Sequence, residues 1–201
     1  MTGIFPHRLF LTAFMAVIIP FSVQAQEASG TMDDDAQVER PALIEMEKYT
    51  GELLQGLTPD QAQYIYEIRI NFGVIRSISE AKKQVASAVN ACGEHNEDLK
   101  EPIETRFQAW DEAVSNTEEQ AEAALEEAIQ RQAFRPVARV NMLLDKIDAA
   151  FEERDSQVEK VPVTTYEACD KLLKSMDETQ GSMTSLLEQT ANTLNGLAIE
   201  S

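Results

Sequence analysis

A stripe of apolar and small residues between Asp98 and Phe134 constrains the fold more than any other feature of the sequence. Its members recur at alternating intervals of three and four residues, the spacing of one face of an α-helix. They are Ile103, Phe107, Trp110, Val114, Thr117, Ala121, Ala124 and Ala128. Because a helix can bury such a stripe only against another element, this helix needs partner helices.

Four other stretches carry similar stripes and begin or end at recognisable signals, such as a proline in the first turn or a terminating glycine. We expect helices over 41–55, 59–93, 137–158 and 165–197. The stripe of the fourth helix in chain order consists of Val137, Val140, Leu144, Ile147 and Phe151. Gly73, inside the second helix, favours a close helix crossing or a mild bend.

No stretch has the length and alternation of a useful β-strand; Val161–Thr165 contains β-prone residues but is too short. The sequence therefore predicts an all-α fold. We expect an antiparallel up-down-up-down bundle of four long helices, with an additional short N-terminal helix, in a single domain over 41–201. The heptad-like stripes suit coiled-coil contacts within one chain or between chains, so they leave the oligomeric state open.

The N-terminal segment predicts export. A short cationic start at His7 and Arg8, an apolar run from Leu9 to Phe21 and the small residues of Val23-Gln24-Ala25 follow the order of a cleavable signal peptide, 1–25. The run is shorter than the ~20 residues of a membrane span, so we expect no stable membrane insertion after cleavage. The bacterial periplasm or the outside medium is the expected location, and a eukaryotic secretory route stays open.

The stretch 26–40 is polar, lacks an apolar period and contains the acid run Asp33-Asp34-Asp35. We expect a disordered acidic leader. The run lacks the spaced ligands and the glycine of an EF-hand loop. It therefore does not indicate a calcium site.

The charge balance argues against nucleic acids as partners. The chain carries 35 Asp and Glu against 17 Lys and Arg, a net charge of −18. Such a field repels nucleic-acid phosphates and anionic lipid surfaces. We therefore expect no nucleic-acid binding.

The two cysteines, Cys92 and Cys169, predict a disulfide. In an exported protein two cysteines usually pair, and the alternating helix directions bring both to the same end of the bundle. The bond would close a loop of nearly 80 residues and stabilise the fold by up to about 4 to 5 kcal/mol in the chain-entropy model. A redox-active role would need a Cys-x-x-Cys pair or an exposed thiol of low pKa, and the sequence indicates neither.

The sequence contains no catalytic motif. It has no Gly-x-Ser-x-Gly and no glycine-rich phosphate loop. His95 is the single histidine after cleavage, so a histidine-rich zinc site and a di-iron site with paired Glu-x-x-His motifs are excluded. We assign no catalytic, metal or cofactor residue and expect no enzymatic activity, although a hydrolase with an unrecognised site stays an alternative.

A polar seam within the bundle is the one candidate ligand site in the sequence. Its residues are Met142, Met176, Gln180 and Met183. Thioethers can hold Cu(I) or serve as an axial haem ligand, whereas methionine at helical spacing usually fills a core. A buried glutamine usually sets helix register. A four-helix bundle that binds copper or non-covalent haem is therefore an alternative function.

The segment Leu57-Thr58-Pro59-Asp60-Gln61 resembles the Leu-Thr-x-x-Gln box of the periplasmic stress chaperones of the Spy and CpxP type. Those proteins are α-helical dimers with a concave client-binding surface, and their box normally occurs twice, whereas it occurs once here. The resemblance implies ATP-independent holding of unfolded clients. The same five residues also meet the requirements of a helix capping box.

The sequence as a whole favours an exported, non-catalytic helical bundle that binds a protein partner or assembles with itself. Such a protein should expose an apolar patch once its bundle is packed. Candidate residues for the patch, or for contacts to the first helix, are Tyr64, Tyr66, Leu125 and Ile129.

Overall fold

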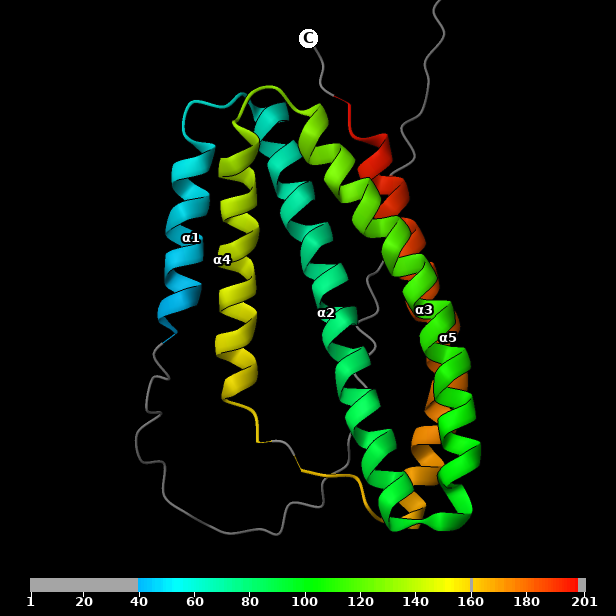
Figure 1. Cartoon of the computed structure of the whole chain (residues 1–201). Coiled ribbons are helices and arrows are strands. Elements are labelled where there is room, and N and C mark those ends of the chain that lie inside the picture. Colours follow the sequence, from blue (N-terminus) through cyan, green and yellow to red (C-terminus); the bar gives the residue numbers. More distant parts are fainter. Residues whose placement is uncertain (1–39, 160, 199–201) are drawn as a thin grey trace, which may run out of the picture. The chain divides into compact units, whose positions relative to one another are not determined.

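The computed structural model describes residues 40–159 and 161–198 (Figure 1). These residues form five α-helices and no strand, which confirms the all-α fold. The helices are α1 (Pro41–Leu54), α2 (Pro59–His95), α3 (Glu97–Arg131), α4 (Val137–Ser156) and α5 (Tyr166–Gly196). The long helices α2 to α5 alternate in direction, as predicted. The expected signal peptide, and the expected leader apart from Arg40, lie outside the described residues.

Local capping explains why two of the helices begin where the sequence predicts. The Thr58 hydroxyl accepts a hydrogen bond from the Gln61 amide at 3.3 Å, and the Gln61 side chain accepts one from the Thr58 amide at 3.1 Å. This capping box satisfies two backbone donors at the start of α2. Thr165 caps α5 in a similar way by accepting from the Ala168 amide at 3.3 Å.

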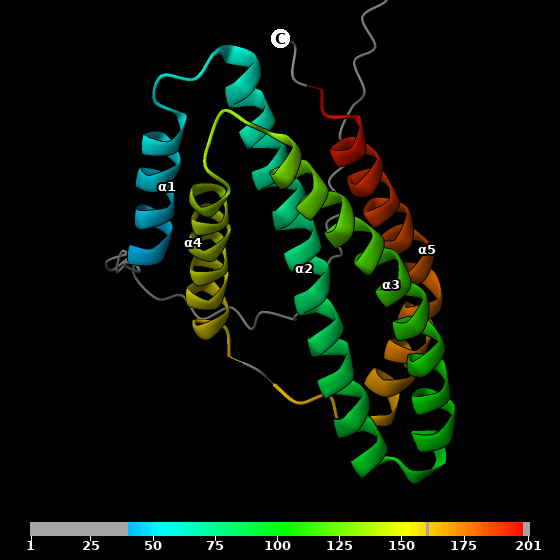
Figure 2. The same ribbon diagram turned by 45° about the horizontal axis from the view of Figure 1, so that its top comes forward.

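Three long helices, α2, α3 and α5, pack against one another and form what we call the three-helix core (Figure 2). Helix α3 packs against both of the others, so its predicted stripe is enclosed. All members of the stripe except Phe107 are buried, and Trp110 is 0% exposed. The apolar stripe of α3 therefore lies at the centre of the three-helix core.

Helices α1 and α4 pack side by side and form a second unit of packing, the α1–α4 pair. The Glu153 carboxylate of α4 accepts hydrogen bonds from the Ala42 amide at 3.2 Å and the Leu43 amide at 3.3 Å, at the start of α1. The Tyr49 hydroxyl donates to the Arg139 carbonyl at 3.0 Å. Helix α4 also packs against α2 and, more lightly, against α3, which attaches the pair to the three-helix core.

The cysteines meet where α2 ends and α5 begins. Cys92 and Cys169 form a disulfide with their Cα atoms 5.7 Å apart, which confirms the expected proximity. The Asn96 side chain, between α2 and α3, donates to the Cys92 carbonyl at 3.2 Å and to the Thr164 carbonyl at 3.0 Å. These bonds tie together three chain segments at this end of the protein.

Of the two expectations for Gly73, the close helix crossing is wrong, and the mild bend stays a prediction. A Cβ atom placed on Gly73 would meet no heavy atom within 4 Å beyond its chain neighbours and the nearby backbone of its own helix. The glycine therefore lies beside open space, and this space is the pocket described below.

None of the helices in the described ranges combines the length and the apolar character that a membrane span requires.

Candidate functional site

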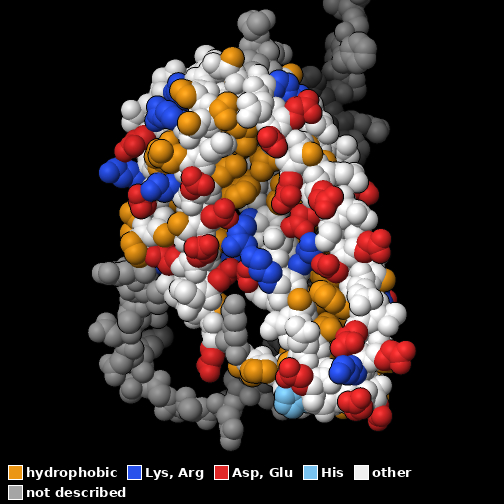
Figure 3. All heavy atoms as spheres, in the orientation of Figure 1, with side chains coloured by type: hydrophobic (Ala, Val, Ile, Leu, Met, Phe, Trp, Pro, Cys, Tyr) orange, Lys and Arg blue, Asp and Glu red, His pale blue; other side chains and the backbone are white. Residues whose placement is uncertain are grey.

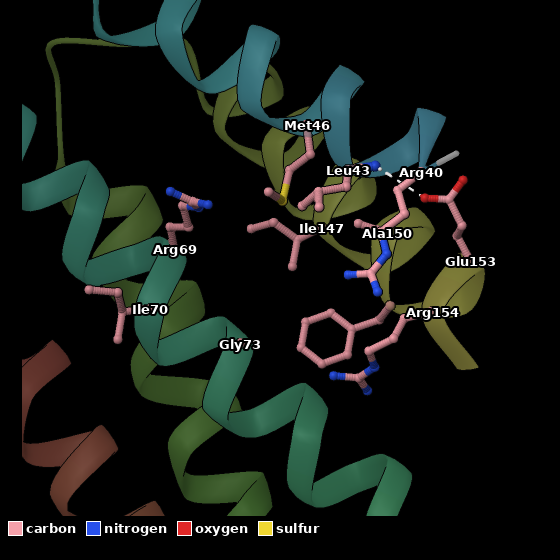
Figure 4. A pocket seen from close by; sticks show the side chains of 11 residues that line it. Arg40, Leu43, Met46, Arg69, Ile70, Gly73, Ile147, Ala150, Glu153 and Arg154 are labelled. Carbon is pink, nitrogen blue, oxygen red and sulfur yellow. Dashed lines mark hydrogen bonds between the residues drawn. The ribbon is translucent and has the colours of Figure 1, made fainter. Parts of the chain in front are cut away.

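A pocket of about 430 Å³ lies between α1, α2 and α4 (Figure 4). Helices α1 and α2 both pack against α4, but they pack little against each other, so a space stays open between them. This volume falls within the range of roughly 300 to 1,000 Å³ that is typical of small-molecule sites. The pocket therefore arises from the way the α1–α4 pair attaches to α2.

The walls of the pocket are mostly apolar. Their apolar side chains come from all three helices and are those of Leu43, Met46, Ile70, Ile147, Ala150 and Phe151. Gly73 adds bare backbone to the α2 wall, and the missing side chain leaves part of the volume open. Such walls favour a ligand with an apolar body.

Arginines provide most of the charge around the pocket. The lining contains Arg40, Arg69 and Arg154 but a single acid, Glu153. This excess of cations is local, because acids outnumber bases two to one in the whole chain and spread over the face shown in Figure 3. In Figure 4 the guanidinium groups of Arg40 and Arg154 lie toward one end of the pocket, and that of Arg69 lies on the other side, toward Met46.

The single acid of the lining is already engaged. The carboxylate of Glu153 binds the first amides of α1, and a helix N-terminus carries a partial positive charge that such a carboxylate neutralises. Arg69 binds Glu47 at 2.7 Å, and Arg154 binds Asp155 through Nε at 2.9 Å and Nη2 at 2.8 Å. Neither Glu47 nor Asp155 lines the pocket. The polar groups that face the pocket are therefore predominantly cationic donors.

A fourth arginine, Arg76, lies next to Phe151, with its Cζ atom 5.9 Å from the ring centroid. Burial acts to lower the pKa of Arg76, but hydrogen bonds to Asp148 at 2.7 Å and Glu80 at 3.5 Å outweigh it and raise the pKa. The Arg154 Cζ atom lies 4.5 Å from the Phe151 centroid. Guanidinium groups thus hold Phe151 in place at one end of the pocket.

The pocket shares no residue with the polar seam that the sequence indicated. Met176, Gln180 and Met183 lie together on α5, where Met176 is 1% exposed and Met183 packs against the core. Met142 lies on α4 and is 47% exposed, and α4 does not pack closely against α5. The structure therefore brings three of the four residues together.

The Gln180 side chain has a partner within the protein. Its Oε1 atom accepts a hydrogen bond from Arg106 Nη2 at 2.8 Å. Arg106 also donates to the Met176 carbonyl at 3.1 Å and to Asp177 at 2.5 Å. This network links α3 to α5 and fixes their register, the usual role of a polar residue in a helical seam.

Most of the residues expected to form an exposed patch instead belong to the core. Tyr64, Leu125 and Ile129 are buried, and the Tyr64 hydroxyl donates to the Ala128 carbonyl at 2.8 Å. Burial raises the pKa of Tyr64. Tyr66 alone among these candidates stays exposed. In Figure 3 hydrophobic side chains gather in the upper half of the view, around α2 and α4.

The remaining titratable groups suggest no metal centre. Within the described ranges, no cluster of three or more His, Cys, Asp or Glu residues is placed to hold a metal ion. His95 Nδ1 lies 2.9 Å from the Ala91 carbonyl oxygen in the last turn of α2. A second pocket, of about 550 Å³ between α3 and α5, has a mainly polar lining, so the arginine-bordered pocket is the candidate site for an apolar ligand. Sequence reasoning missed it, although Gly73 was a signal of it.

Comparison with protein-family models, with curated proteins and with solved structures finds no match to this chain.

Proposed function

We propose that this chain is an exported, non-catalytic helical protein that binds a small molecule with an apolar body in the pocket between α1, α2 and α4. The observation that carries the proposal is a pocket of about 430 Å³ whose walls include six apolar side chains from three helices. Transfer of an apolar ligand from water into such a pocket is favoured by about 25 cal/mol for each Å² that it buries. Export follows from the predicted signal peptide.

The chemistry of the lining supports binding rather than catalysis. Arginine stays protonated in proteins and therefore cannot exchange protons as a general acid or base near neutral pH. The carboxylate of Glu153 is engaged in capping α1. No Ser, Thr, Cys, Lys, His or Tyr lines the pocket, so the capped carboxylate of Glu153 is its one side chain of a nucleophile type. A disulfide suits an oxidising compartment outside the cytosol.

Fluorescence of a neutral apolar probe, N-phenyl-1-naphthylamine, tests this function. We expect the mature protein to enhance the fluorescence saturably, with one probe bound per chain. Gly73→Phe should abolish binding, because the new ring would occupy the pocket. Gly181→Phe is the matched control, since Gly181 is also a helical glycine with nothing within 4 Å of its ideal Cβ, and it lies on α5. Equal binding by both variants would contradict the proposal.

Binding of a protein partner, or self-assembly, stays a second candidate function. It is favoured by two exposed apolar residues on α1 and α2, two of the helices that form the pocket. Ile44 on α1 is 68% exposed, and Ile70 on α2 is 58% exposed. Isolated apolar residues are common on surfaces, but Ile70 also lines the open pocket, and exposed apolar surface of this kind can bind a partner. Native mass spectrometry would decide: a dimer that Ile44→Glu dissociates supports assembly, and a monomer at all concentrations contradicts self-assembly.

A further inference from the structure

We infer that the pocket selects a single-chain amphiphile with one anionic head group, bound with its head between Arg40 and Arg154 and its chain along the apolar walls. The inference rests on the proposed function, because it names the ligand class of the same pocket. The lining complements the charge of such a head group, and its polar and apolar groups are arranged along one direction of the pocket.

The position of the head group follows from the donors at the Phe151 end of the pocket. Arg154 uses Nε and Nη2 to bind one oxygen of Asp155, which leaves Nη1 without a bond to any described residue. Arg40 makes no ion pair with a carboxylate in the part of the chain that the structure describes. Figure 4 shows both guanidinium groups at this end. Two guanidinium groups can bind an anion through charge-assisted hydrogen bonds.

The opposite end of the pocket does not offer an equivalent anion site. Arg69 is the single guanidinium group there, and its Nη2 atom binds Glu47 at 2.7 Å, whereas Arg40 and Arg154 lie together at the other end. Between the two ends, Leu43, Met46 and Ile147 present only apolar surface. A molecule with one charged end and one hydrocarbon end therefore matches the pocket in a single orientation.

A cationic amphiphile is the natural competitor, because a net charge of −18 attracts cations to the protein as a whole. The two hypotheses differ in salt dependence and in site. Binding through the general acidic field would not depend on Arg40, whereas binding through the pocket would. A comparison of anionic and cationic head groups therefore distinguishes binding at the pocket from nonspecific attraction to the protein.

The test is competition for the bound neutral probe by four amphiphiles of equal chain length, each below its critical micelle concentration. These are dodecanoate, dodecyl phosphate, dodecanol and dodecyltrimethylammonium. We expect both anions to displace the probe at least tenfold more tightly than the cation. If the protein binds dodecanoate more tightly than dodecyl phosphate, the natural ligand is a free fatty acid. The reverse order of affinity would indicate a ligand with a phosphate head group.

A charge-reversal pair locates the head group. Arg40→Glu should weaken dodecanoate binding by tenfold or more and should weaken probe binding much less. Arg139→Glu is the matched control, because it changes the net charge equally on an exposed residue of α4 outside the pocket lining. We expect it to change dodecanoate affinity less than twofold.

The outcomes distinguish the inference from the proposed function. If the probe does not bind saturably to the wild-type protein, the proposed function fails, and the inference fails with it. If the probe binds but all four amphiphiles displace it equally, or Arg40→Glu and Arg139→Glu behave alike, the selectivity for anions is overturned while the pocket stands.

Discussion

The three-helix core and the α1–α4 pair are built from similar amphipathic helices but differ in how completely they enclose their apolar side chains. In the core, α3 lies against both α2 and α5, and Ile103, Trp110 and Val114 are each 0% exposed. In the α1–α4 pair, α1 has α4 as its principal partner, and Leu43 stays partly exposed beside the pocket. A helix that packs against two partners has its apolar side chains fully enclosed. A helix with one principal partner leaves space beside its apolar side chains for a ligand.

Side-chain size contributes to the difference. The upper part of the α3 stripe consists of Ala121, Ala124 and Ala128, all buried, and small residues allow neighbouring helices to approach closely. Large aromatic side chains fill the part below, where Phe107 stacks on Trp110 with ring centroids 6.1 Å apart. At the pocket, by contrast, a small residue faces open space: Gly73 has no neighbour within reach of a Cβ atom.

The largest effect expected is on the core. Trp110→Ala should lower the free energy of unfolding by about 3 to 5 kcal/mol, because the ring is fully enclosed and its loss leaves a cavity. Leu43→Ala should cost about 1 kcal/mol or less, since the space beside Leu43 is already open. Urea denaturation followed by far-ultraviolet circular dichroism measures both. Equal losses would show that the two regions are packed equally well.

The disulfide should matter for stability but not for binding. Replacing both Cys92 and Cys169 by Ser should cost about 2 to 4 kcal/mol, because the bond joins residues 77 positions apart and restricts the unfolded chain. Gly73 lies about 30 Å from Cys92 along α2, so affinity for the apolar probe should not change. Loss of probe binding by the folded double variant would indicate that the two regions are coupled.

A smaller and local effect is expected at the start of α1. Glu153→Gln should weaken the cap by about 1 kcal/mol and make α1 amides exchange with deuterium about fivefold faster, with α3 unchanged. Glu152→Gln is the control, because Glu152 is its exposed neighbour on α4. Faster exchange throughout the protein would mean that α1 does not open independently of the core.

The smallest change in the free energy of unfolding is expected from replacing either of two glycines of α2. Gly73→Ala should raise the free energy of unfolding by about 0.5 to 1 kcal/mol, because alanine favours the helix and the added methyl group meets no neighbour. Gly93→Ala should raise the free energy of unfolding less, since a Cβ atom at this position would lie 3.3 Å from the Lys100 Cγ atom. Thermal unfolding of the two variants tests the difference, and a larger gain at Gly93 would contradict it.

The helices and the disulfide could be predicted because their signals are local or topological. The capping box at Thr58 lies within four residues of chain. The proximity of Cys92 and Cys169 follows once the helix directions alternate. Neither inference required knowing which helix packs against which.

The pocket could not be predicted, because it depends on the choice of partner. Leu143 of α4 is fully buried although it lies outside the predicted stripe, and Leu144 within that stripe is only partly buried. Helix α4 contacts α1 on one side and α2 on another, so a single apolar face does not describe it. Exposed Met142 illustrates the same point, since the prediction placed it in a seam with α5.

The cap on α1 also has a consequence for the order of folding. The carboxylate that binds the Ala42 and Leu43 amides lies 111 and 110 residues later in the chain. Such distant contacts form late, because closing a long loop costs conformational entropy, whereas α2 and α3 form a hairpin of adjacent helices early. During synthesis from the N-terminal end, α1 emerges well before α4 is available to receive it. We therefore expect the pocket to be completed in the last steps of folding, so that only fully folded molecules carry a ligand.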